Sequence, residues 1–255
     1  MIELTKNLYR TVKSLDERKT RRKEGAFKAE GTKCVLDTLG HFNLRHLFAT
    51  HEWITNHGAD IKSVVDCDAL VKVTRNDISR MTSLSTPSDV IAVYEIPERK
   101  IELPSLADKL ILALDTIQDP GNLGTIIRVA DWFGIREIIC SNETADCFAP
   151  KVIQSTMGSI SRVKLYYGNL PEMINEVGAK SVYGTFLDGE DIRKATLQQK
   201  GIIVIGNEGK GISAEVEATV TERLLIPSYP EGQETGESLN AAIATAITLA
   251  KFRGI

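Results

Sequence analysis

The sequence predicts an α/β protein with two parts: a C-terminal part built on a mostly parallel sheet, and a small N-terminal α/β part. Beyond residue 107, short apolar runs alternate with helical stretches, which is typical of a parallel sheet covered by helices on both faces. The apolar runs are nearly continuous and rich in β-branched residues, as expected for strands that are buried on both faces. The segment 97–104 is charged and bracketed by prolines, so it predicts a linker. We therefore expect an N-terminal domain over 1–97, a linker over 98–107 and a C-terminal domain over 108–255.

In the N-terminal part, the pattern predicts one long helix followed by short strands and helices. Apolar residues recur at spacings near four over residues 3–24, which predicts a helix there. Thr74 is a suitable N-cap with the acidic Asp77 three residues later, and this pair predicts a helix start. The other elements expected in this part are strands at 26–30, 46–50, 63–67 and 90–96 and a helix at 32–39.

Six apolar runs predict the strands of the C-terminal sheet, and helical segments lie between them. These runs are residues 110–114, 137–140, 162–166, 181–186, 201–205 and 223–226. A last helix is expected over 239–252. Ligands of open parallel sheets bind beyond the carboxyl ends of the strands, so the polar and glycine-rich segments after these strands are the candidate site.

The composition narrows the classes of function. No apolar run approaches the roughly 20 residues that cross a bilayer, and the N-terminus lacks the layout of a signal peptide, so we expect a cytoplasmic protein. The four cysteines show no Cys-x-x-Cys spacing and predict reduced, buried thiols. The four histidines, at spacings of five and six, match no metal-ligand pattern, so no metal is expected.

The formal net charge of −3 does not by itself indicate a nucleic-acid partner, but the N-terminus is locally basic. Residues 1–30 hold nine Lys or Arg against five Asp or Glu, centred on Arg18-Lys-Thr-Arg-Arg-Lys23. Such a cluster is either a solvated helix face or a surface that contacts RNA phosphates. The candidate RNA-binding residues are Lys19, Arg21, Arg22 and Lys23.

The first motif after a predicted strand is Asn122-Leu-Gly-Thr-Ile-Ile-Arg128. Residues 119–122 predict a turn, and the apolar positions that follow predict a helix with Arg128 in its second turn. On its own this pattern could also be a turn followed by a solvated arginine.

The second motif is Gly206-Asn-Glu-Gly-Lys-Gly211. It is not a P-loop, because only two residues separate its first Gly from the Gly-Lys pair, and it lacks the G-x-G-x-x-G pattern of dinucleotide-binding loops. Glycines expose backbone groups that could bind an adenine edge or a ribose. A plain turn between a strand and a helix is the alternative.

The third motif joins Ile226-Pro227, a loop over 228–237 and Ser238-Leu-Asn240 before the last helix. As a helix N-cap, Ser238 would have a purely structural role. None of the three motifs contains a cysteine or an Asp/His set, which argues against covalent attack and metal-assisted hydrolysis. Group transfer from a cofactor, with the protein positioning the reactants, is the chemistry that remains.

At these motifs the sequence resembles the SpoU (TrmH) family of the SPOUT superfamily, S-adenosylmethionine-dependent RNA ribose 2′-O-methyltransferases. The resemblance covers nearly all of residues 108–255, including the stretch 150–158. Residues 19–27 and 30–34 resemble the RNA-binding domain of that family. The matching patterns are Asn-x-Gly-x-x-x-Arg at 122–128, Gly-x-Glu-x-x-Gly at 206–211, Ile-Pro at 226–227 and Ser-Leu-Asn at 238–240.

The resemblance implies a deep C-terminal trefoil knot, a homodimer formed through the knotted domain, and methyl transfer to RNA, with ribosomal RNA favoured over tRNA. The alternatives are a tRNA methyltransferase, a non-catalytic RNA-binding protein with the same fold, and a nucleotide-binding metabolic enzyme. The loop 228–237 is longer than is usual in the family, and Val129 replaces a small polar residue.

The resemblance also implies the residues of the site. Arg128 would act on the 2′-hydroxyl as proton acceptor, or would hold a neighbouring phosphate. The other implied catalytic residues are Asn122, Glu208, Ser238 and Asn240. The implied S-adenosylmethionine-binding residues are Gly206, Ile226, Leu239, Leu187, Gly189 and Gly211.

Overall fold

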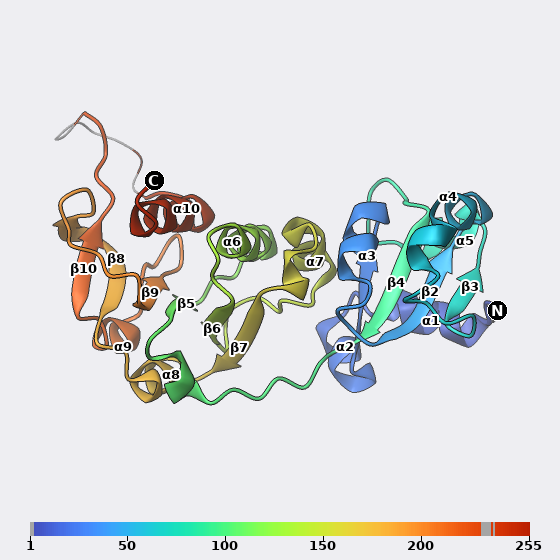
Figure 1. Cartoon of the computed structure of the whole chain (residues 1–255), viewed down its shortest axis with the longest axis horizontal. Coiled ribbons are helices and arrows are strands. Elements are labelled where there is room, and N and C mark those ends of the chain that lie inside the picture. Colours follow the sequence, from blue (N-terminus) through green and yellow to red (C-terminus); the bar gives the residue numbers. More distant parts are fainter. Residues whose placement is uncertain (1–2, 231–235, 237) are drawn as a thin grey trace. The chain divides into compact units, whose positions relative to one another are not determined.

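The structure is a computed structural model that describes residues 3–230, 236 and 238–255 (Figure 1). Its contacts divide the chain into two compact units. One unit comprises Met1–Glu98 with Asp146–Ser161, and the other comprises Arg99–Ala145 with Arg162–Ile255. The sequence-based domains differ from these units at 146–161, a segment that no local pattern separates from the C-terminal part. The predicted end of the N-terminal domain at 97 and the predicted start of the C-terminal domain at 108 stay predictions.

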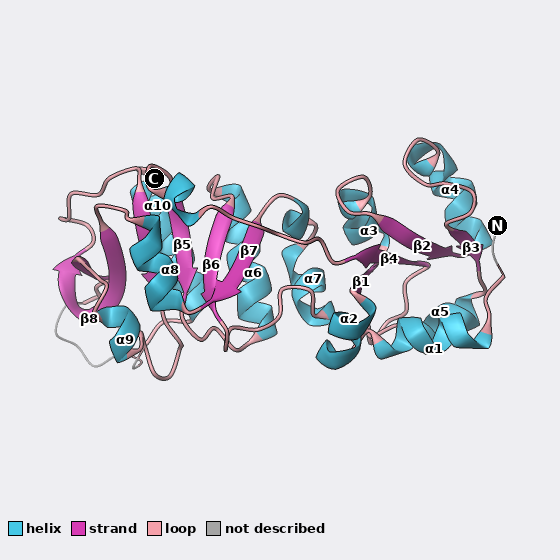
Figure 2. Cartoon of the chain, turned by 90° about the horizontal axis from the view of Figure 1, so that it is seen from below, coloured by secondary structure: helices cyan, strands magenta, loops and turns pink. Residues whose placement is uncertain are grey.

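The N-terminal unit is built on a four-stranded sheet in the order β1-β4-β2-β3 (Figure 2). β4 pairs antiparallel with β1 and β2, while β3 pairs parallel with β2. α7 packs on β1, although its residues follow strand β6 (Glu137–Ser141) in the sequence. The elements of this unit are α1 (Lys6–Ser14), α2 (Arg18–Glu24), β1 (Ala26–Glu30), α3 (Thr32–Thr38), β2 (Leu44–Ala49), α4 (His51–Ile61), β3 (Leu70–Lys72), α5 (Arg75–Met81), β4 (Val90–Glu95), α7 (Pro150–Thr156) and the 3₁₀ turn η2 (Ser159–Ser161).

Two expected elements of the N-terminal unit are wrong. The single helix over 3–24 is interrupted, because α1 ends at Ser14 and α2 begins at Arg18. The strand expected at 63–67 is a turn region with Val64 exposed, and the strand forms instead at β3, where Val71 is fully buried. Two adjacent valines at 64–65 are typical of a strand, but the residues that pair with β2 are those of β3.

The helix start expected at Thr74 is confirmed. The Thr74 side chain accepts a hydrogen bond from the Asp77 backbone at 3.2 Å, and Asp77 accepts one from the Thr74 backbone at 3.0 Å. The pair therefore forms a capping box at the start of α5. The hydrogen bond from the Thr74 hydroxyl is the main reason that the pKa of Asp77 is lowered.

The C-terminal unit is a six-stranded parallel sheet in the order β10-β8-β9-β5-β6-β7, which confirms the expected fold class. α6 and α10 pack together on one face of the sheet, and α8 and α9 lie on the other (Figure 1). Among the described residues, no helix is long and apolar enough to span a bilayer. The elements are the 3₁₀ turn η1 (Leu103–Leu106), β5 (Leu110–Leu114), α6 (Pro120–Trp132), β6 (Glu137–Ser141), β7 (Lys164–Gly168), α8 (Leu170–Val177), β8 (Val182–Asp191), β9 (Gly201–Ile205), α9 (Ala214–Glu217), β10 (Glu222–Leu225) and α10 (Ala241–Phe252).

The strand order places a switch point between β5 and β9. From β5 the chain adds β6 and β7 on one side, and β9 and β8 lie on the other side. β5 and β9 pair from Leu110↔Gly201 to Leu114↔Ile205, so the loops after both strands leave the sheet together. A crevice for a ligand is expected at such a point. The trefoil knot implied by the resemblance stays a prediction.

Candidate active site

The loop after β9 folds back on itself and needs glycine at its first position. Asn207 and Gly211 exchange two backbone hydrogen bonds of 2.9 and 2.8 Å. A Cβ atom on Gly206 would lie 2.5 Å from Ile212 N and 2.6 Å from Gly211 O, so no larger residue fits without moving the backbone. Gly211 has a φ of 71°, which favours glycine. The loop is therefore a closed turn of exposed backbone groups.

Asn207 links this loop to the loop that follows β5. Its side-chain oxygen accepts hydrogen bonds from the backbone of Gly209 at 2.9 Å and of Lys210 at 3.1 Å. Its amide nitrogen donates to the carbonyl oxygen of Thr116 at 2.9 Å. Asn207 was not among the predicted site residues, although an Asn in a glycine-rich segment directly after a strand is a known turn signal.

Three motifs that are far apart in the sequence meet in one hydrogen-bond network. The amide of Asn122 donates to Oε1 of Glu208, and the amide of Asn240 donates to Oδ1 of Asn122 at 2.9 Å. The hydroxyl of Ser238 donates to the backbone carbonyl of Glu208 at 3.1 Å. The structure thus brings together four of the five side chains that the sequence proposed as catalytic.

The last helix is capped by Asn240, so the structural role considered for Ser238 is wrong. Oδ1 of Asn240 accepts from the backbone of Ala242 at 3.0 Å and of Ile243 at 3.3 Å. α10 therefore begins at Ala241, two residues later than expected. Capping fixes the Asn240 side chain while its amide nitrogen still reaches Asn122.

Arg128 lies outside this network. It is exposed on α6, and within the part of the chain that the structure describes its guanidinium has no hydrogen bond or ion pair. Because α6 begins at Pro120, Arg128 falls in the third turn rather than the second. It lies six residues beyond Asn122, or about 9 Å along the helix axis. Its guanidinium is available to a ligand outside the protein.

A cavity of about 560 Å³ adjoins the network. Small-molecule sites commonly occupy roughly 300–1,000 Å³. Five of the six predicted cofactor-binding residues line it: Gly206, Gly211, Ile226, Leu239 and Leu187. The lining residues that lie outside the predicted motifs and loops include Thr185, Glu217, Ala241 and Ala244. Ala241 and Ala244 could have been found from their spacing of three in the first turn of the last helix.

Gly189, the sixth predicted cofactor-binding residue, does not line this cavity. A Cβ atom at this position would lie 2.6 Å from Leu224 C and 2.7 Å from Arg223 O. The pairing of β8 with β10 shifts register between Arg223 and Leu224. The close approach of two strands thus requires a glycine at 189, and its contact with the cofactor stays a prediction.

The residues around the cavity suit S-adenosylmethionine, a ligand with an adenine, a ribose and a cationic sulfonium. Apolar side chains such as Ile226 and Leu239 provide surface for the adenine ring. The backbone at Gly206, which no side chain covers, can hydrogen-bond polar atoms of the adenine or the ribose. The lining also carries charged groups: the carboxylate of Glu208, the ammonium of Lys210, and Glu217, which pairs with Arg223.

A second cavity of about 630 Å³ lies where β5, β6 and β7 end, but none of the predicted site residues lines it. Four carboxylates line it, those of Asp115, Glu143, Glu172 and Glu215, and no Lys or Arg of the described residues does. Such a lining repels phosphate groups. The 560 Å³ cavity beside the network is therefore the better candidate for the site.

All four cysteines are free thiols, but only three are buried. Burial raises the pKa of Cys34 to about 12, so this thiol stays protonated near neutral pH. Cys67 is exposed, which corrects the expectation that all four are buried. No cysteine lines the cavity or joins the network.

Of the predicted RNA-binding residues on α2, three are exposed: Lys19, Arg22 and Lys23. Arg21 is the exception, because it is 2% exposed and hydrogen-bonded within the N-terminal unit. Its Nη2 lies 2.6 Å from Oδ2 of Asp146. Burial and pairing leave Arg21 no free donor face toward a phosphate, so its predicted RNA contact is wrong.

The family model of the SpoU rRNA Methylase family matches residues 109–250, and that of the MRM3-like substrate binding domain matches residues 7–92. The chain is 32% identical to the Bacillus subtilis 23S rRNA (guanosine(2553)-2′-O)-methyltransferase RlmP, over 95% of this chain and 94% of that protein.

Solved structures agree with this match. A putative RNA methyltransferase of the TrmH family from Porphyromonas gingivalis is 38% identical, with a TM-score of 0.84 and 98% of each chain covered. The AdoMet-bound rRNA methyltransferase from Sinorhizobium meliloti is 29% identical, with a TM-score of 0.85 over 99% of this chain and 97% of that one. Together with the network of Asn122, Glu208 and Asn240, these matches establish that the chain belongs to the SpoU rRNA methylase family.

Proposed function

We propose that this protein is an enzyme that transfers the methyl group of S-adenosylmethionine to a ribose 2′-hydroxyl of RNA. The network of Asn122, Glu208 and Asn240 beside the 560 Å³ cavity carries the proposal. A purely RNA-binding protein would have no need of three polar side chains fixed by one another at the edge of a small-molecule cavity. The relatives from Bacillus subtilis and Sinorhizobium meliloti, which are named as rRNA methyltransferases, support the same reaction.

The cavity residues would hold the cofactor, which supplies an electrophilic methyl group when bound. The backbone at Gly206 and Gly211 would hydrogen-bond polar edges, while Leu187, Ile226 and Leu239 would cover apolar surface. Two hydrogen bonds hold Glu208 at the cavity: the Asn122 amide donates to its carboxylate and the Ser238 hydroxyl donates to its backbone carbonyl. These residues would thus exclude water and orient the ribose.

For Arg128 we propose the role of a phosphate clamp rather than of a proton acceptor. A guanidinium stays protonated in proteins, so it is a poor base but a good bidentate partner for a phosphate. Its exposure and its lack of partners among the described side chains leave all its donors available. A phosphate held there would lie beside the reacting hydroxyl and could take its proton.

Ribosomal RNA is the substrate that we favour over tRNA. The Bacillus subtilis and Sinorhizobium meliloti relatives are named for rRNA, and the N-terminal match is to a substrate binding domain. Lys19, Arg22 and Lys23 on α2 would contact its phosphates. A substrate of this kind would place the enzyme in the cytoplasm.

The direct test is methylation of purified RNA with S-adenosylmethionine carrying a labelled methyl group. We expect label in rRNA and little in tRNA. The labelled ribose should resist alkaline cleavage at its 3′-phosphodiester bond, because a methylated 2′-oxygen cannot attack the neighbouring phosphorus. Label in tRNA alone would refute the rRNA assignment. Tight RNA binding with no label in any RNA, and no binding of S-adenosylmethionine by calorimetry, would point to the non-catalytic alternative.

We further propose that the protein forms a homodimer through α6 and α10, which pack together. Both helices expose large apolar side chains that a monomer would leave in water: Trp132 is 85% exposed, Ile243 52% and Ile247 39%. Ile243 and Ile247 are four residues apart and so lie on one face of α10. An exposed apolar face of this kind is typical of an interface.

The double substitution Ile243→Glu with Ile247→Glu is expected to convert the dimer to a monomer, because charged residues would have to be buried in the interface. Light scattering coupled to size-exclusion chromatography measures the mass. Val64→Glu is the control, since Val64 is an exposed apolar residue of the N-terminal unit. A wild-type protein that is already monomeric at micromolar concentration would contradict the proposal.

A further inference from the structure

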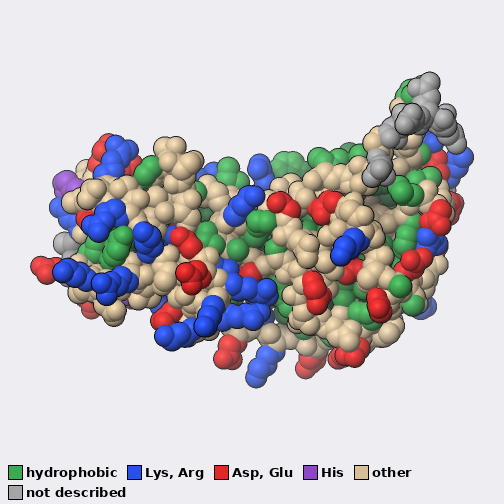
Figure 3. All heavy atoms as spheres, turned by 180° about the vertical axis from the view of Figure 1, so that it is seen from behind, with side chains coloured by type: hydrophobic (Ala, Val, Ile, Leu, Met, Phe, Trp, Pro, Cys, Tyr) green, Lys and Arg blue, Asp and Glu red, His purple; other side chains and the backbone are tan. Residues whose placement is uncertain are grey.

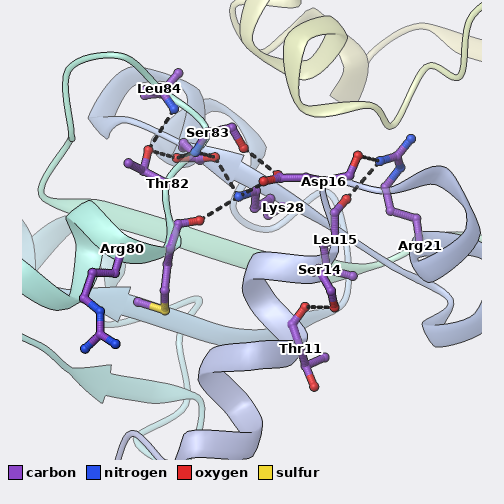
Figure 4. Close-up of polar contacts among 12 residues, drawn as sticks. Thr11, Ser14, Leu15, Asp16, Arg21, Lys28, Arg80, Thr82, Ser83 and Leu84 are labelled. Atoms are coloured by element: carbon purple, nitrogen blue, oxygen red, sulfur yellow. Dashed lines mark hydrogen bonds and ion pairs between the residues drawn. The ribbon is translucent and has the colours of Figure 1, made fainter.

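The junction between α1 and α2 is held by a buried arginine (Figure 4). Nη1 of Arg21 donates to the backbone carbonyls of Leu15 at 2.9 Å and of Asp16 at 2.8 Å. The same guanidinium pairs with Asp146. Arg21 therefore satisfies the carbonyls at the end of α1 and fixes the angle at which α2 begins.

A buried lysine on β1 holds the same junction from the other side (Figure 4). Lys28 is 1% exposed, and its Nζ lies 2.9 Å from Oδ1 of Asp16 and 3.1 Å from Oε1 of Glu30. It also donates to the carbonyl of Met81 at 2.8 Å. Ser83 donates to Asp16 at 2.5 Å. Arg21 and Lys28 therefore stabilise the fold, and their hydrogen bonds hold the turn between α1 and α2 in place.

The remaining basic side chains of α1 lie on one face of the helix. Lys6, Arg10 and Lys13 are spaced by four and three residues, and all three are exposed. α1 contains no acidic residue, and in the described part of the chain none of these three side chains has an ion pair. The other side of the helix packs Val12 into the core of the unit.

We infer that α1 and α2 form one RNA-binding surface, in which Lys6, Arg10 and Lys13 bind phosphates together with the exposed basic residues of α2. The inference rests on the proposed function and extends its RNA contacts from α2 to α1. Cations without ion-pair partners suit a polyanion, and the left half of Figure 3 shows many Lys and Arg side chains with some Asp and Glu among them. The junction fixes α1 and α2 relative to each other before RNA binds, so RNA binding would cost little conformational entropy.

The test compares two double variants with equal loss of charge. Lys6→Gln with Lys13→Gln removes two lysines of α1, and Lys62→Gln with Lys72→Gln removes two exposed lysines elsewhere in the same unit. The dissociation constant for an rRNA fragment is measured at several salt concentrations. Each lost phosphate contact lowers the slope of log K against log salt by about 1.

For the α1 variant we expect a slope smaller by about 2 and an RNA KM raised severalfold, with kcat unchanged. The control variant should match the wild type in all three quantities. If the two variants have the same slope and the same KM, the inference is wrong. A wild-type protein that binds RNA but does not methylate it would overturn the proposed function instead, and the salt slopes would still decide the role of α1.

Discussion

Replacing Arg128 with alanine is expected to lower kcat/KM at least about 100-fold, in the range seen when one group that stabilises a transition state is removed. The affinity for S-adenosylmethionine should not change, because Arg128 does not line the cavity. Stability should also be preserved, since Arg128 is exposed and makes no ion pair among the described residues. Labelled-methyl turnover and calorimetry measure the two effects separately.

Arg128→Lys separates the two roles considered for this residue. Lysine keeps the positive charge but loses the bidentate fork, so a phosphate clamp should be weakened and not abolished. A proton acceptor would instead give a rate that rises with pH toward the pKa of lysine. The control is Lys164→Ala, at the start of β7 and so at the opposite end of the strands from the site. Wild-type turnover in Arg128→Ala would exclude both roles.

Replacing Gly206 with alanine is expected to lower the affinity for S-adenosylmethionine more than about tenfold, a loss of about 1.4 kcal/mol or more. The added methyl group would meet only backbone atoms, at 2.5 Å from Ile212 N and 2.6 Å from Gly211 O. Backbone cannot move aside as a flexible side chain can, so the loop that lines the cavity must open. Calorimetry measures the affinity, and thermal unfolding shows whether the rest of the domain stays folded.

Gly209→Ala in the same loop is the matched comparison. Its added methyl group would come no nearer than 3.7 Å to Asn207 Oδ1, an ordinary contact distance. We therefore expect a much smaller loss of affinity than for Gly206→Ala. Equal affinities of the two variants would mean that the close approach of Gly206 and Gly211 does not shape the site.

Local patterns predicted most elements because strands and helices are largely set by nearby residues. β5 and β9 were found as five-residue apolar runs, and α5 from its capping pair. The break between α1 and α2 could not be found in this way. It depends on Arg21 and Lys28, whose partners Asp146 and Met81 lie far along the chain.

The same limit applies to individual residues of the site. The basic cluster marked Arg21 as an RNA contact, but its pairing with Asp146 places it inside the fold. The resemblance places Gly189 at the cofactor cavity, but only the structure shows that a Cβ atom there would meet the backbone of Arg223 and Leu224. A sequence pattern shows which residue types are present and how they are spaced. It does not show whether a given side chain is buried, faces solvent or faces the cavity.

Residue types and short spacings were enough to predict the fold class, the three motifs and the resemblance to a family, because all of these are local properties of the chain. The contacts of Asn122 with Glu208 and Asn240 join residues that are 86 and 118 positions apart, so they could be seen only in the folded chain. The folded chain also leaves Arg128 facing outward. Such contacts follow from the order β8-β9-β5-β6, and strand order is set by packing of the whole sheet rather than by any local pattern.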